Sequence, residues 1–324
     1  MELYVGDTWY PNDILTELVT TETANKAGSL NFSCIRGFDA VTAEKQIVRM
    51  IDGSDTVFRG RVLTASRKTV GAMTVVCEGE LAFFNDSMTK GTTRTGYSGN
   101  LLRYLLNEHN GNVSDYQQLT AGIIYNGNSI TVKGSDTDEV PTMELIAKIA
   151  EASGLIISTE NGSLNLRGAT LNRQKIQFGE NLISFKQEQR KDDIFTRIYA
   201  YGEDSEGNRI TLYHLLGVPY VEDAEAIAQY GVIAKRVNFP AESEQELERK
   251  ARAELRRSHS VNITIEALDL HWKDSTVPRF RVGNVQIISP PDDYNGVLML
   301  HEVRQDWLNP GKNTIKIGTT RKIV

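Results

Sequence analysis

The first 88 residues alternate between apolar and polar side chains, and this pattern constrains the fold most. Residues 29–38 place Leu30, Phe32, Cys34 and Arg36 on one parity. Successive side chains of a β-strand point to opposite faces, so one parity lies on one face. The pattern therefore predicts half-buried strands, each with one face on an apolar core.

Residues 45–68 contain two runs rich in β-branched residues, separated by the turn Asp52-Gly53-Ser54-Asp55. A glycine-containing turn between two such runs predicts a β-hairpin. The alternation continues over residues 70–86, which predicts a third strand.

The stretch CEGELAFFNDS begins at Cys77 and combines a thiol, two glutamates and two aromatic residues. It could form the edge of a catalytic site or the end of a strand. In an alternating strand, Cys77 shares the apolar parity with Val75 and Leu81, whereas Glu78 and Glu80 lie on the other parity. We therefore expect a half-buried strand with Glu78 and Glu80 on a solvated acidic face, pointing away from Cys77.

A helical period replaces the alternation after residue 97. Residues 97–110 are expected to form a helix, with Ser98 as a candidate N-cap. Its apolar stripe consists of Leu101, Leu102, Leu105 and Leu106.

Residues 141–154 give the clearest helical pattern. Pro141 is expected to start this helix, Thr142 to cap it and Gly154 to end it. The predicted buried face consists of Leu145, Ile146, Ile149 and Ala150.

Two short hairpins are expected beside these helices. The first covers 121–134 around Asn126-Gly127-Asn128, and the second covers 155–168 with a turn near Asn161-Gly162. Residues 90–175 are therefore expected to form a small α+β unit between β-rich segments.

The last part of the chain mixes strands with two helices. Residues 194–215 are expected to form two strands, 221–231 a short helix ended by Gly231, and 242–259 a long polar helix. The long helix has a thin apolar stripe that suits packing on a sheet or on another subunit. The stripe is Leu247, Ala251 and Leu255, and the i,i+4 pairs are Glu246–Lys250 and Glu248–Arg252. The strands expected after it are VNITIEALDLHW, FRVGNVQIIS, GVLMLHEVRQDW and NTIKIGT.

Charge and composition exclude several classes of protein. The chain has 324 residues, with 36 basic and 42 acidic residues and a net charge of −6. This balance argues against nucleic acid or an anionic membrane as the main partner. We expect no membrane span and no signal peptide. Cys34 and Cys77 are expected to be core residues of a protein that folds in a reducing cytoplasm.

The sequence contains no recognisable catalytic arrangement. No HExxH, GxSxG or phosphate-binding loop occurs. The histidines are expected to be structural, and the acidic pairs to be solvated turns. These residues are His109, His214, His259, His271 and His301, with Asp136–Asp138, Asp192-Asp193 and Asp292-Asp293. We therefore predict no catalytic, cofactor-binding or metal-binding residue, no cofactor and no enzymatic activity.

Four elements in order resemble one known family. They are RGRVLTASRKTVGAMTVVCEGELAFFNDS (59–87), GENLISFKQEQRKDDIFTRIYAYGED (179–204), YVEDAEAIAQYGVIAKRVNFPAESEQELERKARAELRR (220–257) and FRVGNVQIISP (280–290). Together they resemble the tail-associated "prophage tail" hub proteins of phages of Gram-positive hosts, and the resemblance covers nearly the whole chain.

The resemblance implies a fold and a domain order. The expected class is α+β and mostly β, with two small β-barrel domains and smaller α+β domains. The first barrel would lie in 1–88, completed by later strands, and 89–175 would be an inserted α+β domain. The second barrel would lie in 176–324, with helices 221–231 and 242–258 at its periphery.

The resemblance also implies a structural role at the virion tail tip, after assembly in the bacterial cytoplasm. Such hubs are homotrimers whose ring adapts the sixfold tail tube or distal tail ring to the threefold tip and closes the channel. Implied partners are the tail tube or distal tail protein and a tip fibre, spike or receptor-binding protein that serves host cell attachment. Genomic DNA would pass through the lumen without specific binding, so the lumen is expected to be neutral or acidic.

Two alternatives remain at this point. One is a tail-associated cell-wall endopeptidase or lysin, since some relatives carry "endopeptidase" in their names. Many relatives also continue beyond the position of Val324 into a fibre, receptor-binding or peptidoglycan-cleaving part, and a cleaving activity would belong there or to a separate protein. The other alternative is the hub of a contractile tail-like bacteriocin or injection system.

Overall fold

The computed structural model describes most of the chain in two compact units. The described residues are 1–35, 41, 46–67, 71–188, 194–203, 208–241, 243–258, 262–288 and 296–318. Unit 1 comprises Met1–Phe185 and Ile265–Ile317, and unit 2 comprises Lys186–Thr264 and Gly318–Val324. The predicted domain boundaries at 88 and 175 stay a prediction.

Seven strands from the N-terminal part form the first lobe of unit 1. They are β1 (Glu2–Val5), β2 (Thr8–Tyr10), β3 (Leu15–Thr23), β4 (Ser29–Cys34), β5 (Ile47–Asp52), β6 (Asp55–Arg67) and β7 (Met73–Gly79). The predicted hairpin at 45–68 is confirmed as β5–β6. Leu30 of β4 lies opposite Cys77 of β7, and Phe32 lies opposite Val75. All four side chains are fully buried, as the alternation predicts. Arg36 lies outside the described residues.

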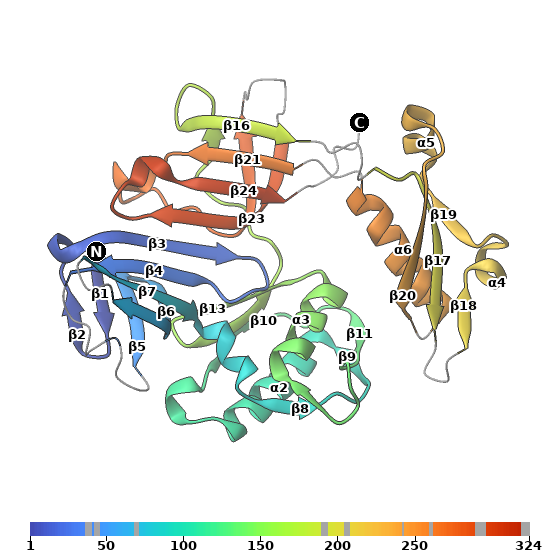
Figure 1. The fold of residues 1–324 in the computed structure, drawn as a ribbon, viewed down its shortest axis with the longest axis horizontal. Helices are drawn as coiled ribbons and strands as arrows, with labels where there is room; N and C mark the ends of the chain where they lie inside the picture. The colour runs from blue at the N-terminus through green and yellow to red at the C-terminus, as the bar shows by residue number, and fades with distance from the viewer. Residues whose placement is uncertain are drawn as a thin grey trace. The chain divides into compact units, whose positions relative to one another are not determined.

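Six strands from the second half of the chain form the second lobe. They are β15 (Ile176–Gln177), β16 (Leu182–Glu188), β21 (Asn262–Ala267), β22 (Gly283–Ile288), β23 (Gly296–Asp306) and β24 (Thr314–Gly318). Strand β23 pairs antiparallel with β3, from Glu302 opposite Thr23 to Asp306 opposite Val19. The two lobes are therefore parts of one curled 13-stranded sheet, in the order β16-β21-β24-β23-β3-β4-β7-β6-β5-β1-β2 with β22 and β15 off this path (Figure 1).

A separate α+β domain lies between the two lobes in sequence. Its elements are η2 (Glu80–Asn85), β8 (Met88–Lys90), β9 (Arg94–Tyr97), α2 (Ser98–Asn112), η3 (Asp115–Gln117), β10 (Thr120–Ile124), β11 (Ser129–Val132), β12 (Glu139–Pro141), α3 (Thr142–Ser153), β13 (Ile156–Glu160) and β14 (Ser163–Arg167). The predicted buried face of α3 is confirmed, and it packs with the leucines of α2 in one apolar core. Of those leucines, Leu101 is only partly buried.

Three local predictions in this domain are wrong. The expected hairpin at 121–134 does not form, because β10 pairs with β14 and β11 pairs with β9. Neither Ser98 nor Thr142 caps its helix. The Ser98 hydroxyl instead accepts a hydrogen bond from the Gly127 N–H, and the Thr142 hydroxyl donates to the Ser87 carbonyl. Gly154 ends α3 as predicted, with φ of 67°. The hairpin at 155–168 is confirmed as β13–β14.

Unit 2 is a small sheet covered on one face by a helix. Its elements are β17 (Arg197–Glu203), β18 (Arg209–Thr211), α4 (Tyr213–Leu216), β19 (Tyr220–Glu222), α5 (Ala224–Tyr230), β20 (Ala234–Pro240) and α6 (Glu244–Ser258). The predicted stripe of α6 is confirmed, since Leu247, Ala251 and Leu255 are buried against Ile198 and Ala200 of β17. The helix pairs Glu246–Lys250 and Glu248–Arg252 also form.

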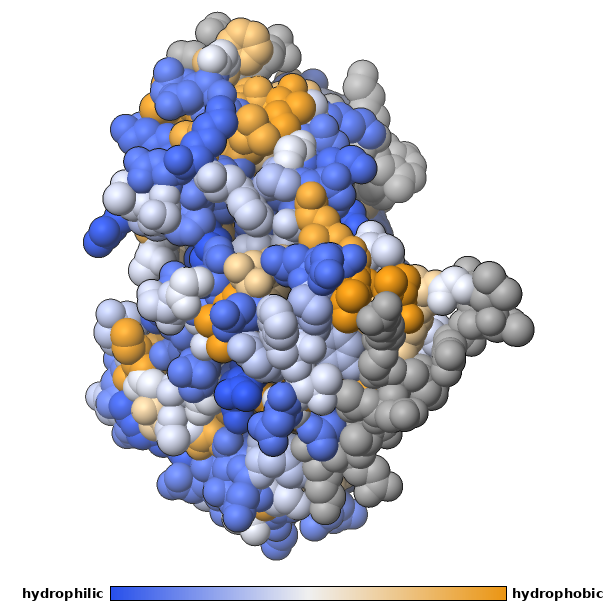
Figure 2. All heavy atoms as spheres, turned by 90° about the vertical axis from the view of Figure 1, so that its left-hand side faces the viewer, coloured by the Kyte–Doolittle hydropathy of each residue, from blue (hydrophilic) through white to orange (hydrophobic). Residues whose placement is uncertain are grey.

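The predicted fold class, α+β and mostly β, is confirmed. Cys34 and Cys77 are fully buried in the core of the first lobe, and burial raises the pKa of the Cys77 thiol. Within the described residues, every helix is too short or too polar to cross a membrane. The face in Figure 2 shows hydrophobic residues in several separate patches among hydrophilic ones.

Candidate functional site

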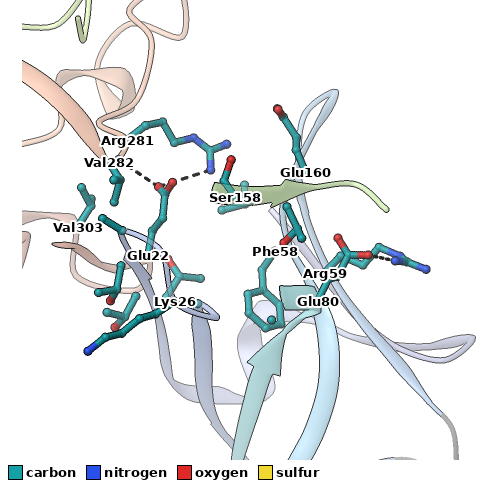
Figure 3. Close-up of a pocket in the computed structure, with 18 of the residues that line it drawn as sticks. Glu22, Lys26, Phe58, Arg59, Glu80, Ser158, Glu160, Arg281, Val282 and Val303 are labelled. Carbon is teal, nitrogen blue, oxygen red and sulfur yellow. Dashed lines mark hydrogen bonds and ion pairs between the residues drawn. The ribbon is translucent and has the colours of Figure 1, made fainter. Parts of the chain in front are cut away.

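One pocket lies where the parts of unit 1 meet, and we call it the junction pocket. It is lined by β3, by β6, by β13 of the α+β domain and by residues 279–282, which precede β22 (Figure 3). Its volume is about 110 Å³. The pocket therefore lies between the first lobe, the second lobe and the α+β domain.

Glu22 of β3 holds the second lobe at this pocket. Its carboxylate accepts a hydrogen bond from the Val282 N–H at 3.4 Å, and the Arg281 guanidinium lies 3.9 Å away. Although 36% of the side chain is exposed, the carboxylate end is crowded by pocket residues. This burial raises the pKa of Glu22, and the charge of Arg281 acts in the opposite direction.

The pocket also contains polar atoms without hydrogen-bond partners among the described residues, namely Ser158 Oγ and Gln305 Nε2. A serine becomes a nucleophile when an adjacent base accepts its proton. The Ser158 hydroxyl is not hydrogen-bonded to Glu22, whose partners are Arg281 and Val282. The described geometry therefore provides a polar cavity, suited to ordered water, rather than an activated nucleophile.

Glu80 is the main correction to the sequence analysis. The strand ends at Gly79, and a 3-10 turn turns Glu80 inward, where only 2% of it is exposed. It forms an ion pair with Arg59 of β6 and accepts a hydrogen bond from the Gly162 N–H at 3.0 Å. Burial lowers the pKa of Arg59. The predicted solvated acidic face is therefore wrong at Glu80, which instead fixes the β13–β14 turn to the first lobe.

Glu78 belongs to a second clamp on the same strands. Arg61 Nε donates to Glu78 at 2.7 Å, and the Arg61 guanidinium also binds the carboxylate of Asp86. Asp86 in turn accepts a hydrogen bond from Gln117 of the α+β domain at 2.7 Å. The acids of CEGELAFFNDS are thus occupied in fixing the α+β domain to the first lobe.

A sequence signal for both clamps exists. Arg59 and Arg61 are two residues apart on β6, and Glu78, on the following strand, is two residues before Glu80, which follows the end of that strand. The register places Arg61 directly opposite Glu78, so Arg59 comes next to Glu80. Opposite charges at matching positions of neighbouring antiparallel strands predict cross-strand ion pairs.

Arg279 joins the second lobe to the β5–β6 turn. Only 9% of it is exposed, it pairs with Asp52, and its guanidinium lies 5.1 Å from the centre of the Trp307 ring. Burial lowers the pKa of Arg279 to about 10, and the neighbouring charge of Arg281 adds to this effect.

Ser87 and His109 form the described contact that most resembles a catalytic pair. Ser87 Oγ lies 2.8 Å from His109 Nδ1, and His109 Nε2 lies 3.2 Å from the Gln117 carbonyl. Burial lowers the pKa of His109, and its Nε2–H donates to that carbonyl. The exposed fractions are 2% for Ser87 and 0% for His109. A substrate cannot reach this pair, which therefore cross-links α2 to the segment between η2 and β8.

The remaining predicted structural residues lie apart from the junction pocket. His271 Nδ1 donates to the Val277 carbonyl at 2.6 Å, His214 lies in α4, and His301 lies in β23. Asp136 accepts a hydrogen bond from the Asp138 N–H in an exposed turn. His259, Asp192-Asp193 and Asp292-Asp293 lie outside the described residues. Where the structure is described, no group of three His, Cys, Asp or Glu side chains could hold a metal ion. The prediction that this chain has no catalytic, cofactor-binding or metal-binding residue stays a prediction.

Comparison with known proteins points to phage tails. Residues 171–324 match the family model described as "Prophage endopeptidase tail". No curated protein matches the sequence. The 43 kDa tail protein of prophage MuSo2 from Shewanella oneidensis is similar in structure, with a TM-score of 0.69, 13% identity, and coverage of 99% of this chain and 98% of that chain.

Two further solved structures share the fold. Prophage tail protein gp18 from Listeria monocytogenes gives a TM-score of 0.62 at 13% identity, covering 99% of this chain and 95% of that one. The Escherichia coli c3393 protein gives 0.51 at 7% identity, covering 99% of this chain and 78% of that one. It is described as a component of the type VI secretion system with structural similarity to T4 tail proteins gp27 and gp5.

These matches confirm that the chain resembles prophage tail proteins and shares their fold over nearly its whole length. Similar structures come from different bacteria, so the restriction to phages of Gram-positive hosts stays a prediction.

Proposed function

We propose that this chain is the structural hub of a phage tail tip. In this proposal three copies form a ring that adapts the sixfold tail tube or distal tail ring to the threefold tip and closes the channel. The similarity of the whole chain to prophage tail proteins supports a tail component, and the likeness of c3393 to gp27 and gp5 supports the hub position.

The observation that carries the proposal is the antiparallel pairing of β3 with β23. It joins the first lobe to the second in one sheet, so each subunit presents two curled lobes in a fixed relation. Three such subunits present six lobes around a threefold axis, which is the arrangement that a sixfold-to-threefold adaptor requires.

The junction pocket supports a structural role rather than catalysis. Glu22, Glu80 and Asp86 are each held by an arginine, and these contacts connect parts of unit 1. A catalytic acid or base must be able to exchange a proton with a bound substrate. Acids already engaged in fixed ion pairs serve instead to hold the lobes and the α+β domain in one geometry.

The proposed partners follow from this position at the virion tail tip. They are two further copies of the chain, the tail tube or distal tail protein, and a tip fibre, spike or receptor-binding protein. DNA would pass through the lumen without specific binding, and a lumen lined mainly by Lys and Arg would contradict this part of the proposal.

The first experiment is a solution mass from light scattering after size exclusion, over a concentration series. The subunit mass is 36.2 kDa. A threefold ring therefore has a mass of about 109 kDa. If the chain stays monomeric alone, the measurement is repeated with the distal tail protein. A monomer or dimer under both conditions would reject the trimeric hub.

The word "endopeptidase" in the family description makes cell-wall cleavage the second candidate. The test is release of soluble fragments from purified peptidoglycan by the full chain. We expect none above the buffer control. Release that disappears when Glu22 is replaced by Gln, but not when Cys77 is replaced by Ala, would place an active site in the junction pocket and reject the structural proposal.

A further inference from the structure

The uncovered face of the unit 2 sheet carries tyrosines and arginines. The side chains of Arg197, Tyr199 and Tyr201 on β17 share this face, because they alternate with the buried Ile198 and Ala200. The register adds residues of the neighbouring strands to the same face. These are Arg209 of β18, Tyr220 and Glu222 of β19, and Arg236 and Asn238 of β20.

Among the described residues of unit 2, an element packs only on the opposite face of this sheet. There, α6 lies against the sheet (Figure 1). Its stripe of Leu247, Ala251 and Leu255 packs on the buried side chains of β17. The tyrosine–arginine face forms an open pocket around Tyr201, lined also by Glu203, Asn238 and Phe239. Tyrosine and arginine are the side chains most enriched where protein partners bind.

Two arginines at this pocket have no carboxylate partner in the part of the chain that the structure describes. The guanidinium carbons of Arg209 and Arg236 lie 4.2 Å and 4.7 Å from the centre of the Tyr201 ring. Among the described residues, neither arginine forms an ion pair, and Glu203 is the acid that lines the same pocket. Arg197, by contrast, is neutralised by Glu222 at 2.7 Å. Among the described residues that line the pocket, two arginines therefore face one acid, in a chain whose net charge is −6.

The open edge of β20 borders this pocket. Among the described strands, β20 pairs only with β17, so the N–H and C=O groups on its other side have no strand partner. Val232 and Ile233, just before this strand, are 56% and 39% exposed. An exposed strand edge is a ready site for an added extended peptide.

We propose that this face, together with the edge of β20, binds an acidic extended segment of a partner protein. The backbone of the segment extends the sheet at β20, and its carboxylates bind Arg209 and Arg236. A single-stranded nucleic acid fits less well, because bases stack on open aromatic rings, whereas guanidinium groups already lie on Tyr201 and Tyr220. This proposal does not depend on the trimeric ring.

The test uses the full chain and a fluorescently labelled peptide of about ten residues that alternates Glu and Thr. The matched peptides replace every Glu by Gln or by Lys. Fluorescence anisotropy should show that the Glu peptide binds about tenfold or more tightly than the Gln peptide, with weakening by salt. Hydrogen exchange measured by mass spectrometry should show slower exchange over β20 in the complex.

The variants distinguish binding at the pocket arginines from a general effect of the charge of unit 2. Arg209→Gln with Arg236→Gln should weaken binding of the Glu peptide about tenfold or more. Arg249→Gln with Arg256→Gln, an equal loss of two charges at exposed positions of α6, should leave it unchanged. Equal binding of the Glu and Gln peptides, undiminished binding by the double variant, or unchanged exchange over β20 would overturn the proposal. So would oligothymidine binding more tightly than the peptide and losing affinity in the same double variant.

Discussion

The junction pocket of unit 1 and the open sheet face of unit 2 both bring arginines close to other side chains, but they pair them differently. In unit 1, Arg59 pairs with the buried Glu80, and Arg279 pairs with Asp52. In unit 2, Arg209 and Arg236 lie over the ring of Tyr201 and form no ion pair with a described residue.

The comparison separates two uses of the same residue type. Removing one partner of a buried ion pair leaves the other charge uncompensated, so those arginines contribute to folding. Removing an arginine that lies over the partly exposed Tyr201 leaves no buried charge uncompensated, and the donors of that arginine remain open to another molecule. We therefore expect the arginine ion pairs of unit 1 to stabilise the fold, and the arginines on the open sheet face of unit 2 to bind a partner.

The largest expected effect is that of Arg59→Ala. Glu80 would remain buried with a single described backbone donor, so we expect the free energy of unfolding of unit 1 to fall by about 3 kcal/mol. All three tryptophans, Trp9, Trp272 and Trp307, lie in unit 1. Urea unfolding followed by tryptophan fluorescence therefore reports on this unit.

The matched control for this experiment is Arg49→Ala on the neighbouring strand β5. Arg49 is exposed and lies 5.8 Å from the centre of the Tyr4 ring, so its loss should cost less than about 1 kcal/mol. Arg59→Ala combined with Glu80→Gln should lower the free energy of unfolding less than Arg59→Ala alone, because the double variant also removes the unpaired buried charge of Glu80. If Arg59→Ala and Arg49→Ala lower the free energy of unfolding equally, the ion pair of Arg59 contributes no more to stability than an exposed arginine over a ring, and the proposed difference between the two regions is wrong.

A smaller effect is expected at His109. Burial lowers its pKa in the folded state, so the unfolded state binds the proton more readily. Its contribution to the stability of unit 1 is therefore complete above the ordinary histidine pKa near 6.5 and falls as the pH drops below that value. His109→Gln should lower the free energy of unfolding by about 1–2 kcal/mol at alkaline pH and reduce the decline in acid. An unchanged pH slope in the variant would show that His109 does not titrate in this range.

Glu22→Gln is expected to have a still smaller effect. Burial raises the pKa of this acid in the folded state, so the unfolded chain releases its proton at a lower pH. Stability is therefore lost as the pH rises from the ordinary value of 4.5 through the folded pKa. The variant should reduce that loss but also forfeits the contact with Arg281, so the net change at neutral pH should stay under about 1 kcal/mol. The tryptophan fluorescence assay across this pH range is the test, and a steeper loss in the variant would contradict it.

Local periodicity predicts the elements of both regions well. The alternation over β4 identifies its buried residues, and the stripe of α6 identifies the face that packs on β17. Both are determined by side chains within one element, whose spacing follows directly from strand and helix geometry. The likeness to prophage tail proteins likewise came from short elements in a fixed order.

Partners distant in sequence were harder to predict. The alternation predicts Glu80 on the solvated face only if the strand continues past Gly79, where the chain in fact enters a 3-10 turn. Residues 121–134 look like a hairpin locally, but β10 pairs in parallel with β14. The junction pocket forms where Glu22 approaches Arg281. The two residues are far apart in the sequence, and the local pattern around each of them does not predict this contact.

The smallest expected change in stability is that of Arg209→Gln with Arg236→Gln. Neither side chain is paired with a described carboxylate, so the free energy of opening of unit 2 should change by less than about 0.5 kcal/mol. Unit 2 contains no tryptophan, so the measurement is hydrogen exchange over α6, which covers the opposite face of the sheet. If the free energy of opening falls by more than about 1 kcal/mol, these arginines stabilise the fold as Arg59 does. The proposed difference between the sheet face of unit 2 and the ion pairs of unit 1 would then be wrong.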